Sequence, residues 1–139
     1  MDVKYTAHAV SSGGGRDGAV RSDDGLIDQQ VKMPPALGGP GGGTNPEQLF
    51  AAAYAACFHG ALRLVGRNEK VDIPDAATVE AQVGIGPEGT SFGLVATIVA
   101  TIPGVDQAQA DDLIAKAHQV CPYSKATRGN VEVTLVAKT

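Results

Sequence analysis

Two cysteines stand out chemically in this chain, because they are the only thiols among its 139 residues. In a reducing compartment such thiols are more often catalytic or inert than joined in a structural disulfide. An ordinary thiol, with a pKa of about 8.5, is only about 3 % thiolate at pH 7. A nucleophilic Cys57 therefore needs a fixed positive charge close by. Cys121 could condense with a sulfenic acid on Cys57, but the sequence leaves open whether the two thiols meet.

Arg16 and Glu47 are the candidates for that charge and for its partner. Arg16 lies in the glycine-rich stretch SSGGGRDG, residues 11–18, and an arginine stays charged at any working pH. A desolvated guanidinium needs a carboxylate to orient it and to offset its burial. Glu47, in the first turn of a predicted helix, is the natural partner, and a Cys57–Arg16–Glu47 network would stabilise a thiolate.

Each of these residues also has a simpler interpretation. Buried free cysteines usually only pack, and an arginine in a glycine-rich turn is commonly exposed. Glu47 could serve the helix dipole alone, an effect of about 0.3 to 1 kcal/mol. Arg128 is a rival cation, but its position before Gly129 and Asn130, after a helix, favours local capping and loop bonding.

The stretch TNPEQLFAAAYAACFHGALRLVG, residues 44–66, predicts the helix that carries Glu47 and Cys57. Asn45 is a good N-cap, with Gln48 at the capping-box position, and Gly66 could close the helix. The helix is apolar on all sides between residues 49 and 58, so we expect protein to cover it all round. This apolar run is too short for a bilayer, which needs about 20 such residues.

Helix geometry separates Glu47 from Cys57. The two residues are ten positions apart, which corresponds to about 15 Å of rise and about 80° of rotation. We therefore expect Glu47, either alone or together with Arg16, to reach the thiol from a second subunit, with the site at a dimer interface.

The rest of the chain predicts strands and one further helix. Val3, Tyr5 and Ala7 alternate in a first strand, and Asp23-Asp24-Gly25 suits a hairpin turn between two short strands. Residues 33–43 are too rich in proline and glycine for regular structure. Further alternation predicts a hairpin over 79–85 and 92–102 and a closing strand over 131–137, and Asp106 caps a helix that Pro122 ends. The order β-β-β-α-β-β-α-β indicates one α+β domain over residues 1–139.

Composition excludes some partners. The net charge is −4 and the 11 Lys and Arg residues are scattered, which argues against a nucleic-acid surface. The N-terminus MDVKYTAHAV alternates polar and apolar residues and does not resemble a signal peptide. We expect a cytoplasmic protein that binds no membrane.

Three stretches together resemble the organic hydroperoxide resistance branch of the OsmC/Ohr family: GGRDG around Arg16, NPEQLFAAAYAACFHGAL around Glu47 and Cys57, and QVCPYSKATRGN around Cys121. The resemblance runs the length of the chain. It implies an α+β OsmC/Ohr-like fold, with antiparallel sheets around central helices, in an intertwined cytoplasmic homodimer. It also implies a thiol peroxidase without a metal or a bound cofactor.

The resemblance further assigns roles to the four residues. Cys57 would be the peroxidatic cysteine, Cys121 the resolving cysteine, and Arg16 with Glu47 the activating pair. The substrates would be organic hydroperoxides, including those of fatty acids, and dihydrolipoamide or a lipoylated protein would reduce the disulfide.

Apolar surroundings would favour such substrates, because each buried methylene contributes about 0.8 kcal/mol. The candidate wall residues, which could equally be plain core, are Leu37, Phe50, Phe92 and Tyr123.

Two other classes of function stay open at this point. The cysteines could report oxidation without turnover, in a binding or sensing module. Alternatively Cys57, His59, His118 and Cys121 could hold zinc, which prefers sulfur and nitrogen ligands. Helix geometry argues against the zinc site, since Cys57 and His59 point about 200° apart on an intact helix.

Overall fold

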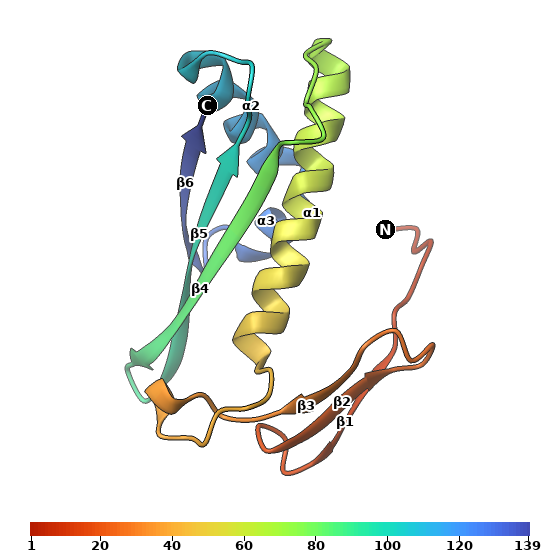
Figure 1. Ribbon diagram of the computed structural model, residues 1–139, viewed down its shortest axis with the longest axis vertical. Helices are drawn as coiled ribbons and strands as arrows, with labels where there is room; N and C mark the ends of the chain where they lie inside the picture. The colour runs from red at the N-terminus through yellow and green to blue at the C-terminus, as the bar shows by residue number, and fades with distance from the viewer. The chain divides into compact units, whose positions relative to one another are not determined.

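The computed structural model describes residues 1–139, which form two compact units, Met1–Leu49 and Phe50–Thr139. The long helix α1 (Pro46–Glu69) begins in the first unit and runs through the second. Figure 1 shows the order of the elements along the chain.

The first unit is a three-stranded antiparallel sheet in the order β1-β2-β3, formed by Ala9–Gly13, Gly18–Ser22 and Asp28–Val31. The turn between β1 and β2 is closed by the Gly14 N–H, which donates to the Asp17 carbonyl at 2.8 Å. Arg16 lies in this turn. The hairpin predicted at residues 23–25 is confirmed, with the Gly25 N–H donating to the Ser22 carbonyl at 3.0 Å.

The strand predicted through Val3, Tyr5 and Ala7 is wrong for the single chain. The first strand begins at Ala9, and residues 1–8 have no regular structure. Tyr5 is 81 % exposed and Val3 is 60 % exposed. Alternation alone makes no strand without a partner for its backbone hydrogen bonds, and this segment pairs with no strand of its own chain.

The second unit contains a sheet in the order β4-β5-β6. The hairpin of β4 (Thr78–Glu88) and β5 (Ser91–Thr101) is antiparallel, and β6 (Glu132–Lys138) runs parallel to β5. A parallel neighbour needs a crossover, and α2 (Gln107–Val120) with α3 (Pro122–Thr127) provides it. One face of the sheet carries three rows of apolar residues, namely Val83–Ala96–Val133, Ala81–Ile98–Leu135 and Val79–Ala100–Ala137.

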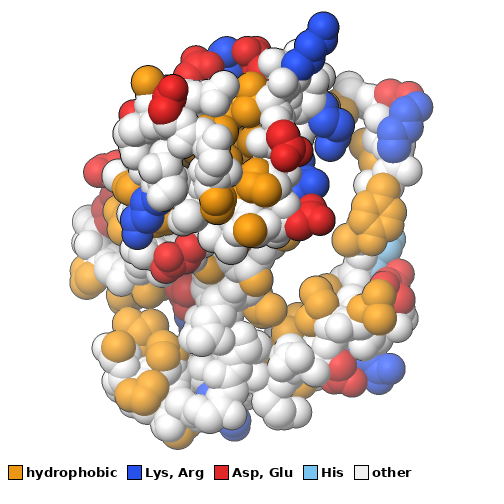
Figure 2. Space-filling view, turned by 45° about the horizontal axis from the view of Figure 1, so that its top comes forward, with side chains coloured by type: hydrophobic (Ala, Val, Ile, Leu, Met, Phe, Trp, Pro, Cys, Tyr) orange, Lys and Arg blue, Asp and Glu red, His pale blue; other side chains and the backbone are white.

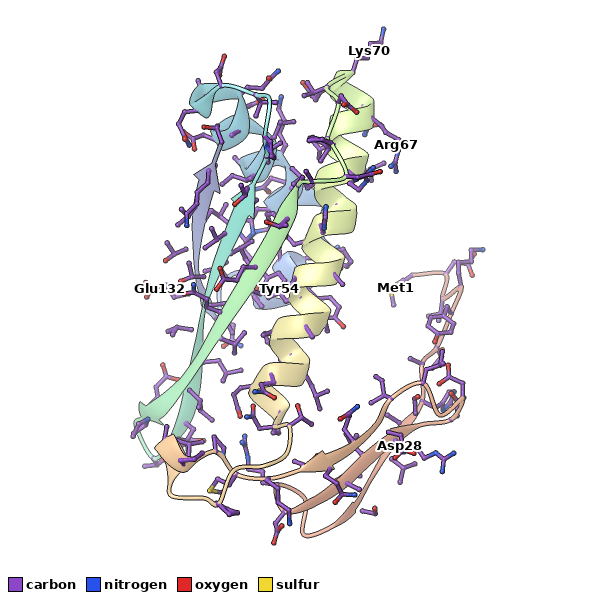
Figure 3. The ribbon with its side chains drawn as sticks, in the orientation of Figure 1. Met1, Asp28, Tyr54, Arg67, Lys70 and Glu132 are labelled. Carbon is purple, nitrogen blue, oxygen red and sulfur yellow. The ribbon has the colours of Figure 1, made fainter.

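The core of this unit forms where α1 and α2 meet that apolar face. Tyr54, Phe58 and Leu62 are fully buried on α1, and Ile98 and Leu113 add to the same cluster from β5 and α2. Figure 3 shows Tyr54 on α1 beside the sheet. Tyr54 therefore lies in the packed core, three positions before Cys57 on the same helix.

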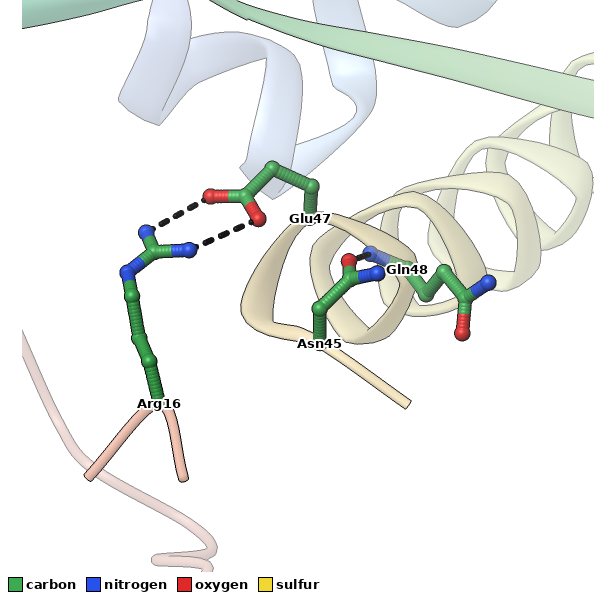
Figure 4. Close-up of polar contacts among 4 residues, drawn as sticks. All are labelled: Arg16, Asn45, Glu47 and Gln48. Carbon is green, nitrogen blue, oxygen red and sulfur yellow. Dashed lines mark hydrogen bonds and ion pairs between the residues drawn. The ribbon is translucent and has the colours of Figure 1, made fainter. Parts of the chain in front are cut away.

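The predicted start of α1 is confirmed. The Gln48 N–H donates to Asn45 Oδ1 at 2.9 Å, as an N-cap requires (Figure 4). The reciprocal half of the capping box is absent, because Gln48 Oε1 accepts the hydroxyl of Thr44 at 2.9 Å instead.

The predicted end of α1 at Gly66 is wrong, since the helix continues to Glu69. Lys70 takes the left-handed conformation, with a φ of 56°, and it follows the last turn that carries Arg67 (Figure 3). Gly66 is buried, and a Cβ there would lie 2.5 Å from Ile73 Cγ1. The glycine therefore provides space for the returning chain.

Helix α1 is a core helix of the unit, although its length and composition would also suit a membrane span. It has 24 residues, which is longer than the apolar run of residues 49–58 considered in the sequence. An 18-residue window of the helix has a mean hydropathy of 1.4. Within one chain it is covered on one side only, so this chain alone does not provide the all-round cover that the sequence predicts. Its exposed side carries Ala52, Ala56, Gly60 and Leu64.

Candidate active site

The two thiols meet. Cys121 Sγ lies 3.7 Å from Cys57 Sγ, within hydrogen-bonding distance of that sulfur. Both cysteines are free. Cys121 is fully buried, whereas Cys57 is partly exposed. Only Cys57 can therefore be reached from outside, with Cys121 directly behind it.

Local chain geometry explains the position of Cys121. Asp106 caps α2 by accepting the Gln109 N–H at 2.8 Å, as predicted. Pro122 disfavours helical geometry in the residue before it, and Cys121 accordingly has a ψ of 123°. Pro122 then occupies the first position of α3, a short helix that the sequence analysis missed. The thiol thus lies at the break between two helices.

The surroundings of Cys57 within the second unit disfavour its thiolate. Burial raises the pKa of the Cys57 thiol above its ordinary value, and the neighbouring Cys121 raises it further. The backbone N–H of Tyr123 partly opposes this pKa shift. No cationic side chain contributes to lowering the pKa. A reactive thiolate therefore needs a positive charge from elsewhere.

Arg16 and Glu47 form the ion pair that the sequence suggests. Arg16 Nη1 donates to Glu47 Oε2 at 3.0 Å, and Nη2 donates to Oε1 at 2.8 Å (Figure 4). The Glu47 side chain is only 13 % exposed, against 39 % for Arg16. The hydrogen bonds from Arg16 lower the pKa of Glu47, and Glu47 raises the pKa of Arg16. The pair is therefore fully ionised near neutral pH, and its guanidinium is held in a fixed orientation.

Of the four predicted wall residues, two meet beside the thiols. The rings of Phe50 and Tyr123 lie 6.3 Å apart, and both contact Tyr54, at 5.9 and 6.0 Å between ring centroids. Phe92 is 65 % exposed at the start of β5, and Leu37 is 37 % exposed in the short helix Pro35–Leu37. Hydrophobic side chains reach the surface at several other places as well (Figure 2).

A buried hydrogen-bond network under Cys121 was missed by the sequence analysis. Tyr54 Oη lies 3.0 Å from Ser124 Oγ and 3.2 Å from Thr127 Oγ1, and His118 Nδ1 lies 2.8 Å from Ser124 Oγ. Ser124 and Thr127 are almost fully buried. One feature of the sequence could have indicated the helix α3 that carries Ser124 and Thr127. Pro122 is favourable at the first position of a helix as well as after the end of one.

Arg128, the zinc ligand set and His59 are the remaining candidates. Arg128 Nη2 donates to the His118 carbonyl at 2.6 Å, which confirms its local role. No group of three or more His, Cys, Asp or Glu side chains could hold a metal ion. His59 Nε2 is buried without a hydrogen-bond partner, and we assign it no role.

Comparison with known proteins identifies the class. The model of the OsmC-like protein family matches residues 39–136. The organic hydroperoxide resistance protein of Xanthomonas axonopodis pv. citri is 51 % identical over 134 residues, which cover 96 % of this chain and 94 % of that protein.

Solved structures agree. An organic hydroperoxide resistance protein from Elizabethkingia anophelis, with thiocyanate bound, has a TM-score of 0.93 and 50 % identity, and the match covers 100 % of this chain and 99 % of that one. A Vibrio cholerae structure with captopril bound in one of the active sites has a TM-score of 0.91 and 43 % identity, covering 99 % and 94 % of the two chains.

The chain therefore belongs to the OsmC-like protein family and has its α+β fold. Within that family it falls in the organic hydroperoxide resistance branch, as relatives about half identical over nearly their full length show. Both results confirm what the three sequence motifs predicted.

Proposed function

We propose that this protein is a cysteine-based peroxidase that reduces organic hydroperoxides to alcohols. The observation that carries the proposal is the contact of an accessible thiol with a buried one, at 3.7 Å between sulfur atoms. A solvent-reachable sulfur can attack a peroxide, and a buried sulfur beside it can then capture the oxidised product. Membership of the organic hydroperoxide resistance branch supports the same chemistry.

In the first step the Cys57 thiolate attacks the distal oxygen of ROOH. The sulfur–oxygen bond forms, the O–O bond breaks, and the leaving alkoxide takes a proton to become the alcohol. Arg16 stabilises the thiolate and the charge that develops on the oxygens, while Glu47 holds the guanidinium. This role is supported by the bidentate pair and by the lack of a cation beside Cys57 in its own unit.

In the second step the Cys121 sulfur attacks the sulfenic sulfur of Cys57. The disulfide forms, the S–O bond breaks, and water leaves. A dithiol then opens the disulfide by thiol–disulfide exchange and becomes a cyclic disulfide itself. Dihydrolipoamide or a lipoylated protein is our proposal for this reductant.

Selection of alkyl and fatty-acid hydroperoxides follows from the rings near the thiol. Phe50 and Tyr123 form an apolar wall on the chain segments that carry Cys57 and Cys121, and both rings pack against the fully buried ring of Tyr54. Each methylene buried there contributes about 0.8 kcal/mol, which hydrogen peroxide cannot gain. Leu37 and Phe92 stay as proposed outer parts of this wall.

We also propose a homodimer, with the site completed across it by Glu47 alone or with Arg16. Ala52, Ala56 and Gly60 recur every fourth residue on the exposed side of α1, and Leu64 continues the row at 42 % exposure. Small residues at this spacing let two helices approach closely. The alternating segment of residues 1–7 pairs with no strand of its own chain and is available to pair with a second one. We place the protein in the cytoplasm, where both thiols are kept reduced.

The test is steady-state consumption of an alkyl hydroperoxide by the purified protein. Dihydrolipoamide is compared with a monothiol as reductant, and hydrogen peroxide with the alkyl hydroperoxide as substrate. We expect turnover that requires Cys57, is faster with the dithiol, and is faster on the alkyl substrate. Absence of turnover with every dithiol, despite oxidisable cysteines, would overturn the peroxidase and favour a sensor.

A further inference from the structure

Four side chains from three helices, three of them buried and His118 half-buried, form one hydrogen-bond network. Tyr54 comes from α1, His118 from α2, and Ser124 with Thr127 from α3. Tyr54 and Ser124 are fully buried, and Thr127 is 4 % exposed. Buried hydroxyls are costly unless each has a partner, so the network fixes how these helices meet.

Counting protons gives the network a direction. The Thr127 hydroxyl donates to the Ser124 carbonyl at 3.1 Å, so Thr127 Oγ1 must accept the single proton of Tyr54. Ser124 must then donate to Tyr54 Oη, because each hydroxyl has only one proton. Ser124 Oγ is therefore the acceptor from His118, whose Nδ1 carries hydrogen. Every hydroxyl in the chain from His118 to the Ser124 carbonyl is satisfied.

Each thiol has a network residue one helical turn away. Tyr54 precedes Cys57 by three positions on α1, where residues three apart are neighbours on the helix surface. Cys121 lies between His118 and Ser124, three positions from each. The break between α2 and α3 that carries Cys121 thus has a network residue on each side, His118 and Ser124. Ser124 is in turn hydrogen-bonded to Tyr54 on the helix of Cys57.

We propose that this network positions Cys121 for attack on oxidised Cys57, with Tyr54 as the positioning residue that links the two helices. The inference rests on the proposed peroxidase function and concerns its second step. The reduced sulfurs are 3.7 Å apart, whereas a disulfide measures about 2.05 Å. The two sulfur atoms therefore need only a short approach, while the hydrogen bonds of the network hold the helices in place. A misplacement of about 1 Å can slow such a step about 100-fold.

Fast attack matters because the sulfenic acid has a competing fate. A second hydroperoxide converts it to a sulfinic acid, which a dithiol does not reduce. A loosened Cys121 would therefore show itself as over-oxidation of Cys57. The first step should be unaffected, because it needs neither Cys121 nor the hydroxyl of Tyr54.

The test is Tyr54→Phe, which keeps the ring and removes the hydroxyl. Tyr5→Phe is the matched control, because Tyr5 is 81 % exposed and lies outside the network. With an excess of hydroperoxide and no reductant, we expect an unchanged rate of the first hydroperoxide-consuming step, slower appearance of the Cys57–Cys121 disulfide, and more sulfinic Cys57 by mass spectrometry. Tyr5→Phe should match the wild type in all three.

A second readout needs no peroxide. Equilibration with a dithiol buffer gives the reduction potential of the Cys57–Cys121 pair. A tenfold weaker tendency to close the disulfide in Tyr54→Phe corresponds to a potential about 30 mV less negative. If Tyr54→Phe does not fold, Thr127→Val removes the acceptor of the Tyr54 proton at nearly constant volume, and Thr127→Ser should restore it.

The outcomes separate the two claims. If the wild type consumes no hydroperoxide, the proposed function fails, and the inference about its second step fails with it, whatever the potential. If the wild type turns over and Tyr54→Phe closes its disulfide at the wild-type rate and potential, only the inference is overturned. A lower melting temperature with an unchanged closing rate and potential would show a purely structural network and would also overturn it.

Discussion

Cys121 Sγ lies in contact with Cys57 Sγ, although 64 positions separate the two residues in the chain. The contact joins the middle of α1 to the break between α2 and α3. One sulfur is partly exposed and the other is fully buried. This asymmetry gives the two thiols different tasks in the proposed cycle.

Removal of the Arg16 charge should slow the first step. In Arg16→Met the thiolate loses its proposed stabilising cation, so we expect a fall of about 100-fold in the rate of sulfenic acid formation. The pKa of Cys57 should rise, because the nearby positive charge that favours the thiolate is gone. Stopped-flow hydroperoxide consumption and the pH dependence of thiol alkylation measure the two effects.

Arg21→Met is the matched control, because Arg21 is an exposed arginine of β2. It should leave both the rate and the pKa unchanged. An unaltered Cys57 pKa in Arg16→Met would show that another cation activates the thiol.

The Arg16–Glu47 pair should make folding stability depend on acid pH. Hydrogen bonds from Arg16 lower the pKa of Glu47 in the folded chain. A depressed carboxyl pKa stabilises the fold above the unfolded value of about 4.3, and that stabilisation is lost as the pH falls through the folded pKa. Urea unfolding between pH 7 and pH 3 should show this loss in the wild type.

In Glu47→Gln that part of the pH dependence should disappear. At pH 7 the variant should be about 1 to 2 kcal/mol less stable, between the values typical of exposed and buried pairs, since Arg16 is partly exposed. Equal slopes for wild type and variant below pH 5 would contradict the assignment.

His118 should add a second pH dependence, nearer neutrality. Burial lowers its pKa, and the positive charge of Arg128 lowers it further. The unfolded chain therefore binds a proton more readily, so stability is greatest above the unfolded pKa of about 6.5. It declines as the pH falls from there through the depressed folded pKa.

His118→Asn should abolish that decline, because its amide can still donate to Ser124 but does not titrate. His8→Asn, at an exposed histidine, should retain it. A decline that persists in His118→Asn would assign it to a different group.

The exposed side of α1 should control assembly. Ala56→Glu places a charge in the middle of the row of small residues, where burying it against a second helix would be costly. We expect sedimentation to show a shift from dimer to monomer, with a matching loss of turnover. Ala108→Glu makes the same change at an exposed position of α2 and should leave the mass unchanged. A wild-type monomer, or an Ala56→Glu dimer with full turnover, would show that this side of α1 does not form a dimer interface.

Local signals were predictable from the sequence because they act within a few residues. The cap at Asn45, the cap at Asp106 and the break before Pro122 all depend on neighbours along the chain. The end of α1 was misplaced because Gly66 is explained by a contact with Ile73, which is seen only after the chain returns.

The candidate site shows the same division. Residue types and motifs identified Arg16, Glu47, Cys57 and Cys121. Their pairing into Arg16–Glu47 and Cys57–Cys121 depends on long-range folding. The network under Cys121 was missed because serine, threonine and tyrosine are common on surfaces, and only their burial makes them notable.

The most direct test of the account is to add one equivalent of alkyl hydroperoxide to the fully reduced protein and to identify the cysteine products by mass spectrometry. We predict a Cys57–Cys121 disulfide in the wild type, no reaction in Cys57→Ser, and a sulfenic acid on Cys57 in Cys121→Ser. A wild-type protein that keeps both thiols free after the peroxide is consumed, or that reacts equally well without Cys57, would contradict the account.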